Sequence, residues 1–391
     1  MQLSVIILNY NVRYFLEQCV LSVQKALENI DGEIIVVDNN SQDESVQMMK
    51  ERFPEVKFIE NYLNVGFPKG NNVGVAEAKG EYICILNPDT VVAGDTFEKV
   101  LAFAQKQNDL GIVGCKLIDG TGNFLPESKR GVPTPWVAFT KIFSLYKVFP
   151  KSKVFNQYYA QHLSENQTGK VDILVGAFMV MKRNLYFEIG GFDENCFMYS
   201  DDIDLSYLVL KTGKSNYYFH ETTVIHYKGE STVRDQTYMK RFREAMQFFY
   251  KKHFGGSFVF DVCMRIGAFF FTLIKKKQQK QLTFDIEQYV LFSKNNNLRN
   301  SLEVQLQKNI IQITEIDENA LFSQVNPEKK HIELLFDNNV FSFKEIIDFM
   351  EKCRNKGFTF KIIPEKSSFM IGSNSSNDRG EVLKFSVEKP T

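Results

Sequence analysis

The sequence has one tryptophan, no closely paired cysteines and no net charge, and each shortage excludes a class of protein. Only one Trp occurs in 391 residues, although Phe occurs 36 times. The 47 basic and 47 acidic side chains cancel, so the chain has no overall electrostatic field that would hold a nucleic acid. We therefore expect no nucleic-acid partner, and any anionic ligand must be bound by local groups.

The cysteines and the N-terminus give no sign of secretion. Six cysteines are scattered without a CxxC spacing, mostly in apolar runs, which predicts buried thiols in a reducing compartment rather than disulfides or a zinc site. The N-terminus, MQLSVIILNYN, lacks the basic region, long apolar stretch and cleavage site of a signal peptide. We expect it to form a first strand and the chain to be cytoplasmic.

Residues 1–115 alternate short apolar runs with segments of helical periodicity. We predict strands at 4–8, 33–37, 57–60 and 82–86, with helices at 15–27, 42–53 and 71–78. Strands that are apolar throughout indicate an α/β fold, with a mostly parallel sheet covered by helices on both faces. Ligands of such sheets bind at the carboxyl ends of the strands, so we look for chemistry there.

The pattern is less regular further along the chain. Glycines and prolines interrupt residues 111–150, and order returns in an apolar run at 171–182. We predict helices at 201–211 and 233–253, separated by a strand at 222–226. These elements complete a first domain, to which we assign residues 1–255.

Residues 256–281 are predicted to form a bridging helix. Residues 257–274 are almost entirely apolar, and four lysines follow between 275 and 280. Eighteen residues with two charges fall short of a transmembrane helix, so we predict an interfacial helix at a membrane surface. A buried or dimer-forming helix is the alternative, and the latter would make the chain a homo-oligomer.

Residues 282–391 are predicted to form a small α/β accessory module. Strands are expected at 332–336 and 358–363, with a helix at 342–356 that Ser342 caps. No catalytic set is evident in this part of the sequence. We expect the module to serve oligomerisation or docking to another protein.

Polar clusters follow the first two predicted strands. The candidate binding residues in these clusters are Asn9, Tyr10, Asp38 and Asn40. A pyrimidine base could stack on Tyr10 while Asp38 accepts its imide N–H. Ser41 has another explanation, because Ser41-x-x-Glu44 matches a capping box for the following helix.

Two further clusters follow the third and fourth strands. In the glycine-rich run NVGFPKGNN, Gly66 permits close backbone approach and Lys69 could meet a phosphate, although the run is neither a P-loop nor GxGxxG. Asn87 and Asp89 lie in NPDT after the strand YICIL. A lone carboxylate there suits a hard divalent cation that binds a diphosphate, and a turn without a ligand is the alternative.

Acidic residues open the helix predicted at 201–211. Asp201, Asp202 and Asp204 follow Ser200, which is a candidate N-cap, and three acids exceed what the helix dipole favours. Neighbouring carboxylates repel, which raises the proton affinity of one of them, as a general base requires. His226 ends the strand predicted at 222–226, where a histidine is either structural or a metal ligand.

In this order the clusters resemble the inverting family 2 glycosyltransferases of the GT-A fold, and more narrowly a rhamnosyltransferase-like branch. The resemblance covers about residues 1–255 and rests on a series of motifs: Asn9-Tyr10-Asn11, VVDNNSQD, NVGFPKGNN, ILNPDT, GGFDE, DDIDL and IHYKGEST. It implies a nucleoside-diphosphate sugar donor, with rhamnose or a hexose as the sugar. The acceptor would be a saccharide, in particular a lipid-linked one, in surface polysaccharide synthesis.

The resemblance also implies roles for individual donor-side residues. Tyr10 and Asp38 would hold the nucleotide base, and Asn72 with neighbouring glycines would lie near the diphosphate. Asp89 would bind Mg²⁺ or Mn²⁺, because it stands where the family's DxD motif ends. Asn87 replaces the first Asp of that motif and would add little coordination.

For the metal shell and the base, the resemblance points to three more residues. His226 would complete the metal shell, and Asp202 would be the general base. Asp201 stands beside it, where the family more often has Glu. A non-catalytic scaffold protein of the same fold is the alternative, and the enzyme would be cytoplasmic or peripheral on the inner face of the plasma membrane.

Overall fold

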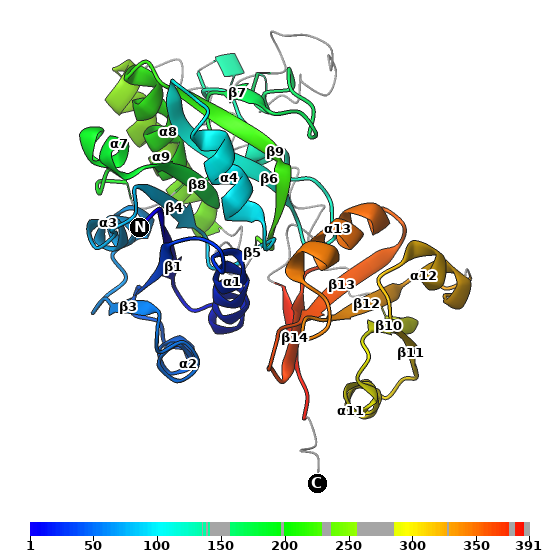
Figure 1. Cartoon of the computed structure of the whole chain (residues 1–391). Coiled ribbons are helices and arrows are strands. Elements are labelled where there is room, and N and C mark those ends of the chain that lie inside the picture. Colours follow the sequence, from blue (N-terminus) through cyan, green and yellow to red (C-terminus); the bar gives the residue numbers. More distant parts are fainter. Residues whose placement is uncertain are drawn as a thin grey trace.

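The chain folds around two β-sheets that lie side by side (Figure 1). The structure is a computed structural model and describes residues 1–134, 136–137, 140, 157–196, 199–228, 236–255, 285–326, 328–374 and 380–386. In these residues the first sheet has nine strands in the order β3-β2-β1-β4-β8-β6-β9-β5, with β7 paired to β9. Its strands are β1 (Leu3–Asn9), β2 (Gly32–Asp38), β3 (Lys57–Glu60), β4 (Tyr82–Leu86), β5 (Thr90–Val92), β6 (Leu110–Ile118), β7 (Gly169–Val171), β8 (Phe178–Lys182) and β9 (Ser215–His226).

The strand directions bring the ends of β1, β2, β4 and β9 to one edge of this sheet. Strands β1 to β4 are parallel, and β8 lies antiparallel between β4 and β6. Strand β9 is parallel to β6, and β5 is antiparallel to β9. The predicted α/β class with a mostly parallel sheet is confirmed.

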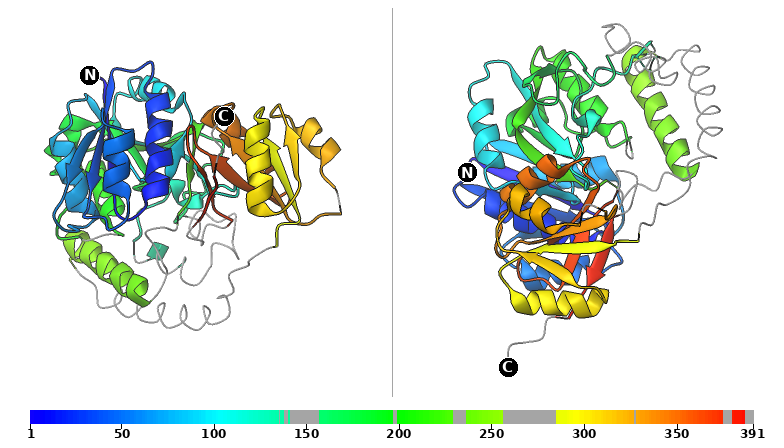
Figure 2. Two further views of the ribbon diagram at one scale, coloured as in Figure 1. Left: turned by 90° about the horizontal axis from the view of Figure 1, so that it is seen from below. Right: turned by 90° about the vertical axis from the view of Figure 1, so that its right-hand side faces the viewer.

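Helices cover both faces of the first sheet because its strands are apolar on both sides. Val5 of β1 packs in a core with α1 (Arg13–Ala26), α2 (Ser45–Arg52) and α4 (Thr96–Ala104). The next residue, Ile6, faces the opposite core with α3 (Phe67–Ala76), α7 (Arg183–Glu188) and α8 (Asp201–Lys211). A short 3-10 helix, η1 (Pro126–Ser128), follows β6. The long helix α9 (Gln236–Phe254) packs on α8 and lies away from the second sheet in both views of Figure 2.

Several boundaries differ from the sequence-based prediction. Helix α3 begins at Phe67 rather than residue 71, since Pro68 fits the first helical turn, where a missing N–H costs no hydrogen bond. Strand β9 begins at Ser215 rather than residue 222. The predicted N-cap Ser200 precedes α8 but makes no capping side-chain bond. Its hydroxyl instead lies 3.1 Å from the Cys196 thiol.

The second sheet corresponds to the predicted accessory module. In the described residues it has six strands in the order β11-β10-β12-β13-β14-β15, of which β14 and β15 are antiparallel additions. Its elements are β10 (Gln288–Phe292), α11 (Asn296–Leu306), β11 (Ile310–Ile313), α12 (Glu318–Gln324), β12 (Ile332–Asp337), α13 (Phe343–Cys353), β13 (Phe358–Ile363), β14 (Phe369–Gly372) and β15 (Glu381–Lys384). The predicted N-cap Ser342 is confirmed and forms a capping box with Glu345.

The two sheets share one apolar cluster. Phe15, Val91 and Ile225 of the first unit pack in it with Phe292 and Ile371 of the second. Ion pairs surround this cluster, including Lys116 to Glu351 at 2.7 Å and Arg354 to Glu165 at 2.7 Å. The module is therefore built onto the α1, β5 and β9 side of the first sheet.

Other sequence predictions concern the membrane and the cysteines. Within the described ranges, no helix has both the length and the apolar character needed to cross a membrane. The predicted interfacial helix at 257–274 and the lysines after it lie outside the described residues. The five described cysteines are buried and form no disulfide among those residues, which confirms the prediction of buried thiols, whereas Cys263 lies outside them.

Candidate active site

Asp38 organises the loop that follows β2. Its buried carboxylate, 1% exposed, accepts hydrogen bonds from Asn9 Nδ2 (2.7 Å) and from both the backbone N–H (2.8 Å) and the hydroxyl (2.7 Å) of Ser41. The capping-box prediction for Ser41 is therefore wrong. Helix α2 begins at Ser45 behind Glu44 without a side-chain cap, because the Ser41 hydroxyl is used by Asp38.

Tyr10 and Asn40 flank Asp38 at the sheet edge and are open to solvent. The Tyr10 side chain is 43% exposed, so its ring offers a surface on which a base can stack. Asn40 is exposed and has a positive φ of 64°, a conformation that turns the chain sharply after Asp38. The predicted base site is thus an exposed aromatic ring beside a buried carboxylate.

The predicted phosphate loop contains a residue that is open to solvent, Lys69, and a residue, Asn72, whose side chain is used in contacts within the protein. Gly66 has φ 86° immediately before α3, which favours glycine, and Lys69 is exposed with its ammonium 4.0 Å from Glu194. Asn72 is different, because its amide binds Phe192 in two directions: Nδ2 donates to the carbonyl (2.9 Å) and Oδ1 accepts from the N–H (3.2 Å). A diphosphate contact therefore suits Gly66 and Lys69 better than Asn72.

Asn87, Asp89 and His226 come together where β4 turns into β5 and β5 pairs with β9. His226 Nε2 lies 3.3 Å from Asn87 Nδ2 and 3.4 Å from Asp89 Oδ1. Burial alone would raise the pKa of Asp89, but the His226 ring and backbone N–H groups outweigh burial and hold this pKa below its usual range. Asp89 is consequently a buried, charged carboxylate.

This cluster fits a divalent cation. Asn87 Oδ1 and His226 Nδ1 are buried and have no hydrogen-bond partner in the structure as described. An unsatisfied oxygen beside a charged carboxylate is an arrangement that a hard cation completes. Among the described residues no group of three or more His, Cys, Asp or Glu side chains could hold a metal ion. A cation bound here would therefore keep water or substrate oxygens among its ligands.

The two predicted catalytic acids have different surroundings in the first turn of α8. Asp202 Oδ2 accepts from Arg130 (2.5 Å) and from the backbone N–H of Gly176 (3.2 Å). Asp201 is also buried, and burial together with the charge of Asp202 raises the pKa of Asp201 to about 7. Asp201 thus has the raised proton affinity that the sequence predicted for one of the neighbouring acids.

Arg130 is a site residue that the sequence analysis did not identify. It lies between β6 and β7 in the glycine- and proline-rich stretch, is 9% exposed and also donates to the carbonyl of Leu174 (3.0 Å). A charged residue inside an irregular stretch usually reaches solvent. Only its pairing with Asp202 gives it a role, and the sequence separation of 72 residues conceals that pairing.

Comparisons with known proteins find glycosyltransferases among the relatives of this chain. A family model described as "Glycosyl transferase family 2" matches residues 4–190. The N-acetylglucosaminyl-diphospho-decaprenol L-rhamnosyltransferase of Mycobacterium tuberculosis is 25% identical over 244 residues, which are 60% of this chain and 78% of that protein. Rhamnosyltransferase WbbL of Escherichia coli K12 is 24% identical over 216 residues, or 52% of this chain and 78% of that protein.

Among solved structures, the mannosyltransferase PcManGT of Pyrobaculum calidifontis, in complex with GDP-Man and Mn²⁺, has a TM-score of 0.45. It is 18% identical, and the alignment covers 68% of this chain and 69% of that one. The family match spans β1 to β8, which include the strand ends with Asp38 and Asp89. The chain is a glycosyltransferase, and its residues 4–190 form a domain that matches glycosyl transferase family 2.

Proposed function

We propose that this glycosyltransferase moves a sugar from a nucleoside diphosphate to a hydroxyl of a lipid-linked saccharide, with inversion and with the help of a divalent cation. One observation carries the proposal. The Asn87 N–H donates to the carbonyl of Ala177 (3.1 Å), and the adjacent Gly176 N–H donates to Asp202 (3.2 Å). The candidate cation ligands and the acidic pair therefore lie next to the same peptide segment, residues 176–177. A single displacement needs such an arrangement, because the leaving group and the attacking hydroxyl must both be close to the anomeric carbon.

The donor would lie along the edge formed by β1, β2 and β4. Tyr10 would stack on the base and Asp38 would accept its N–H, while Gly66 and Lys69 lie toward the diphosphate. Asp89, Asn87 and His226 would hold Mg²⁺ or Mn²⁺. A bound cation offsets the negative charge that gathers on the departing diphosphate.

Asp202 would accept the proton of the attacking hydroxyl. Its Oδ2 is fixed by Arg130 and Gly176, whereas its Oδ1 accepts no hydrogen bond from the described residues. As the acceptor oxygen bonds to the anomeric carbon, the bond from that carbon to the diphosphate oxygen breaks and the hydroxyl proton passes to the carboxylate. A single displacement from the opposite face inverts the anomeric centre.

The names of the relatives support the choice of substrates. The mycobacterial protein is named as a transferase of L-rhamnose to a decaprenol-linked diphosphosaccharide, and the E. coli protein as a rhamnosyltransferase. We extend this to dTDP-rhamnose as the first donor to test and to UDP-hexoses as the second. The reaction would belong to surface polysaccharide synthesis at the inner face of the plasma membrane.

A donor panel tests the proposal. Purified protein is assayed for hydrolysis or transfer of dTDP-, UDP- and GDP-sugars with Mg²⁺, Mn²⁺ or EDTA. We expect turnover of one donor class, its loss in EDTA, and a loss of about 10²-fold or more in Asp89→Asn, because that variant removes the charged ligand. If no nucleotide sugar binds or reacts with any cation, the non-catalytic scaffold becomes the better account.

A further inference from the structure

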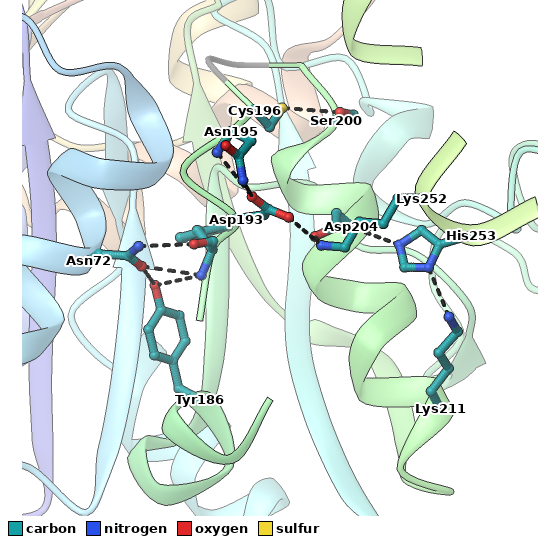
Figure 3. A network of polar contacts seen from close by, with 11 residues as sticks. Asn72, Tyr186, Asp193, Asn195, Cys196, Ser200, Asp204, Lys211, Lys252 and His253 are labelled. Atoms are coloured by element: carbon teal, nitrogen blue, oxygen red, sulfur yellow. Dashed lines mark hydrogen bonds and ion pairs between the residues drawn. The ribbon is translucent and has the colours of Figure 1, made fainter. Parts of the chain in front are cut away.

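Asp204, the third acid in the first turn of α8, has no part in the mechanism above, yet its side chain is only 1% exposed. Both of its oxygens are bound by α9: Oδ1 accepts from His253 Nε2 (2.5 Å) and Oδ2 from Lys252 Nζ (2.8 Å) (Figure 3). The helix that carries Asp201 and Asp202 is therefore held by two side chains from a helix that follows it in sequence.

The protonation states in this contact follow from its partners. Lys211 Nζ lies 2.9 Å from His253 Nδ1, and an ammonium can only donate, so Nδ1 accepts and Nε2–H donates to Asp204. Burial lowers the pKa of His253, which keeps the ring neutral. Lys252 is consequently the cation that balances the charge of Asp204.

Lys252 also reaches a second carboxylate. Its ammonium donates to Asp193 Oδ2 (2.7 Å) in the loop GGFDE, residues 190–194. The preceding residue, Phe192, is bound through both its N–H and its carbonyl by Asn72 of α3. Figure 3 shows the resulting chain of contacts, which runs from α3 through the loop and Lys252 to Asp204 of α8.

Adhesion between α8 and α9 does not require these charges. Met246, Phe249 and Tyr250 already pack against Ile203 in an apolar cluster. Burying an ion pair costs desolvation energy that apolar residues of similar size would avoid. What Lys252 adds by binding a buried carboxylate and a second, partly exposed one is a fixed direction and distance between the elements that carry those carboxylates.

We propose that Lys252 is a positioning residue for sugar transfer. By joining Asp204 to Asp193, it fixes the first turn of α8 relative to α3 and to the donor loop that begins α3. The inference rests on the proposed function, in which Asp202 on that turn receives the proton of a hydroxyl attacking a donor held near Gly66. A small displacement between base and donor costs up to about 10²-fold in rate.

Two readouts on the full-length chain test this role: hydrogen exchange of the amides at 201–204, and kcat with the donor identified by the panel. In Lys252→Met we expect several-fold faster exchange there and a kcat lower by about 10- to 100-fold, with donor KM within about threefold. Lys252→Arg, which keeps a cation for both carboxylates, should recover most of kcat. Lys251→Met is the matched control, because Lys251 is the adjacent exposed lysine, and both readouts should stay unchanged.

The outcomes separate this inference from the proposed function. Unchanged exchange in Lys252→Met, or faster exchange with a normal kcat, overturns the positioning role while transfer by the wild type upholds the proposed function. A wild-type chain that transfers no sugar overturns both. If Lys252→Met does not fold, Lys252→Gln retains an amide donor and is judged by the same two readouts.

Discussion

Asp201 and Asp202 are adjacent on α8, yet their carboxylates meet opposite surroundings. Asp202 is paired with Arg130, whereas Asp201 is buried and its pKa is raised to about 7. Adjacent carboxylates of which one has a raised proton affinity are typical of sites that move a proton. The pair is therefore the place where single substitutions are most informative.

Asp202→Asn should lower transfer by about 10²-fold or more, because the amide cannot accept the acceptor proton. Donor binding, measured by calorimetry with the intact nucleotide sugar, should stay nearly unchanged. The residues proposed to bind the donor lie outside α8, which carries Asp202. A variant that transfers sugar at the normal rate would show that Asp202 is not the base. Asp201→Asn would then be the next substitution to assay.

Arg130→Met should move the acidic limb of the pH profile of kcat/KM to higher pH by about one unit. The charge of Arg130 lowers the pKa of Asp201 against the larger effects of burial and of Asp202. Removing that charge raises the pKa of Asp201 further, so the acidic pair, in which Asp202 is the proposed base, loses its protons only at a higher pH. Arg130→Lys keeps the charge and should shift the limb less, whereas an unshifted profile of lower amplitude would mean a purely structural role.

At the residue scale, the sequence predicts where a polar residue lies in the fold better than it predicts which residues that side chain contacts. The ends of the apolar strands locate Asn9, Asp38 and Asp89, because a parallel sheet gathers its carboxyl ends at one edge. The partners of the acids come from distant irregular or helical segments, as Arg130 and Lys252 do, and no local pattern marks them. Ser41 failed as a cap for the same reason, since Asp38 competes for its hydroxyl.

At the scale of elements, the length of an apolar run decides what the sequence can predict. Strands β1, β2 and β4 are five to seven residues long, are built around continuous apolar stretches, and were predicted. Strands β5 and β7 have three residues each, too short to show a period, and exist because β9 offers them a partner. Strand β9 was predicted short because polar residues interrupt its first half.

A buried ion pair joins strands of the second sheet. Lys361 on β13 is 1% exposed and donates to Glu333 of β12 (2.7 Å) and to Glu381 of β15 (2.8 Å). Glu333 lies on a strand of the parallel part of the sheet, and Glu381 lies on a strand of the antiparallel part. Lys361 thus links the parallel part of the sheet to its antiparallel addition.

Lys361→Met should destabilise the chain by about 3–5 kcal/mol, because Glu333 is then left buried without a cation. The drop would be seen as a lower midpoint of thermal or urea unfolding. The double variant Lys361→Met/Glu333→Leu should recover most of that loss, since the unpaired charge is gone. Equal midpoints for the single variant and the wild type would contradict the assignment of a stabilising pair.

At the scale of the whole molecule, the second sheet completes the core beside the candidate cation site. Tyr227 follows His226, packs edge-on against Phe15 with ring centroids 5.2 Å apart, and belongs to the cluster shared with the second sheet. Val91 lies two residues after Asp89 in the same cluster. The sequence predicted the module but not this shared core, because nothing in a local pattern tells which apolar faces meet.

Removing residues 285–391 should leave an unstable first unit, because the Phe15, Val91 and Ile225 faces would be exposed to water. We expect the shortened chain to aggregate, or to unfold at a temperature well below that of the full chain, as measured by size-exclusion chromatography and thermal melting. A monodisperse fragment with the melting temperature and donor binding of the full chain would show that the module is dispensable.

The shared core also sets an order of events during translation. Strand β5 must wait for β9 to be synthesised before it can pair, and the cover for both strands comes from residues that leave the ribosome after β9. At about 5–20 residues per second, that cover follows β9 by roughly ten to thirty seconds. The nascent protein therefore carries an uncovered apolar corner for most of this interval, and the corner that holds Asp89 and His226 matures only after the second sheet has been made.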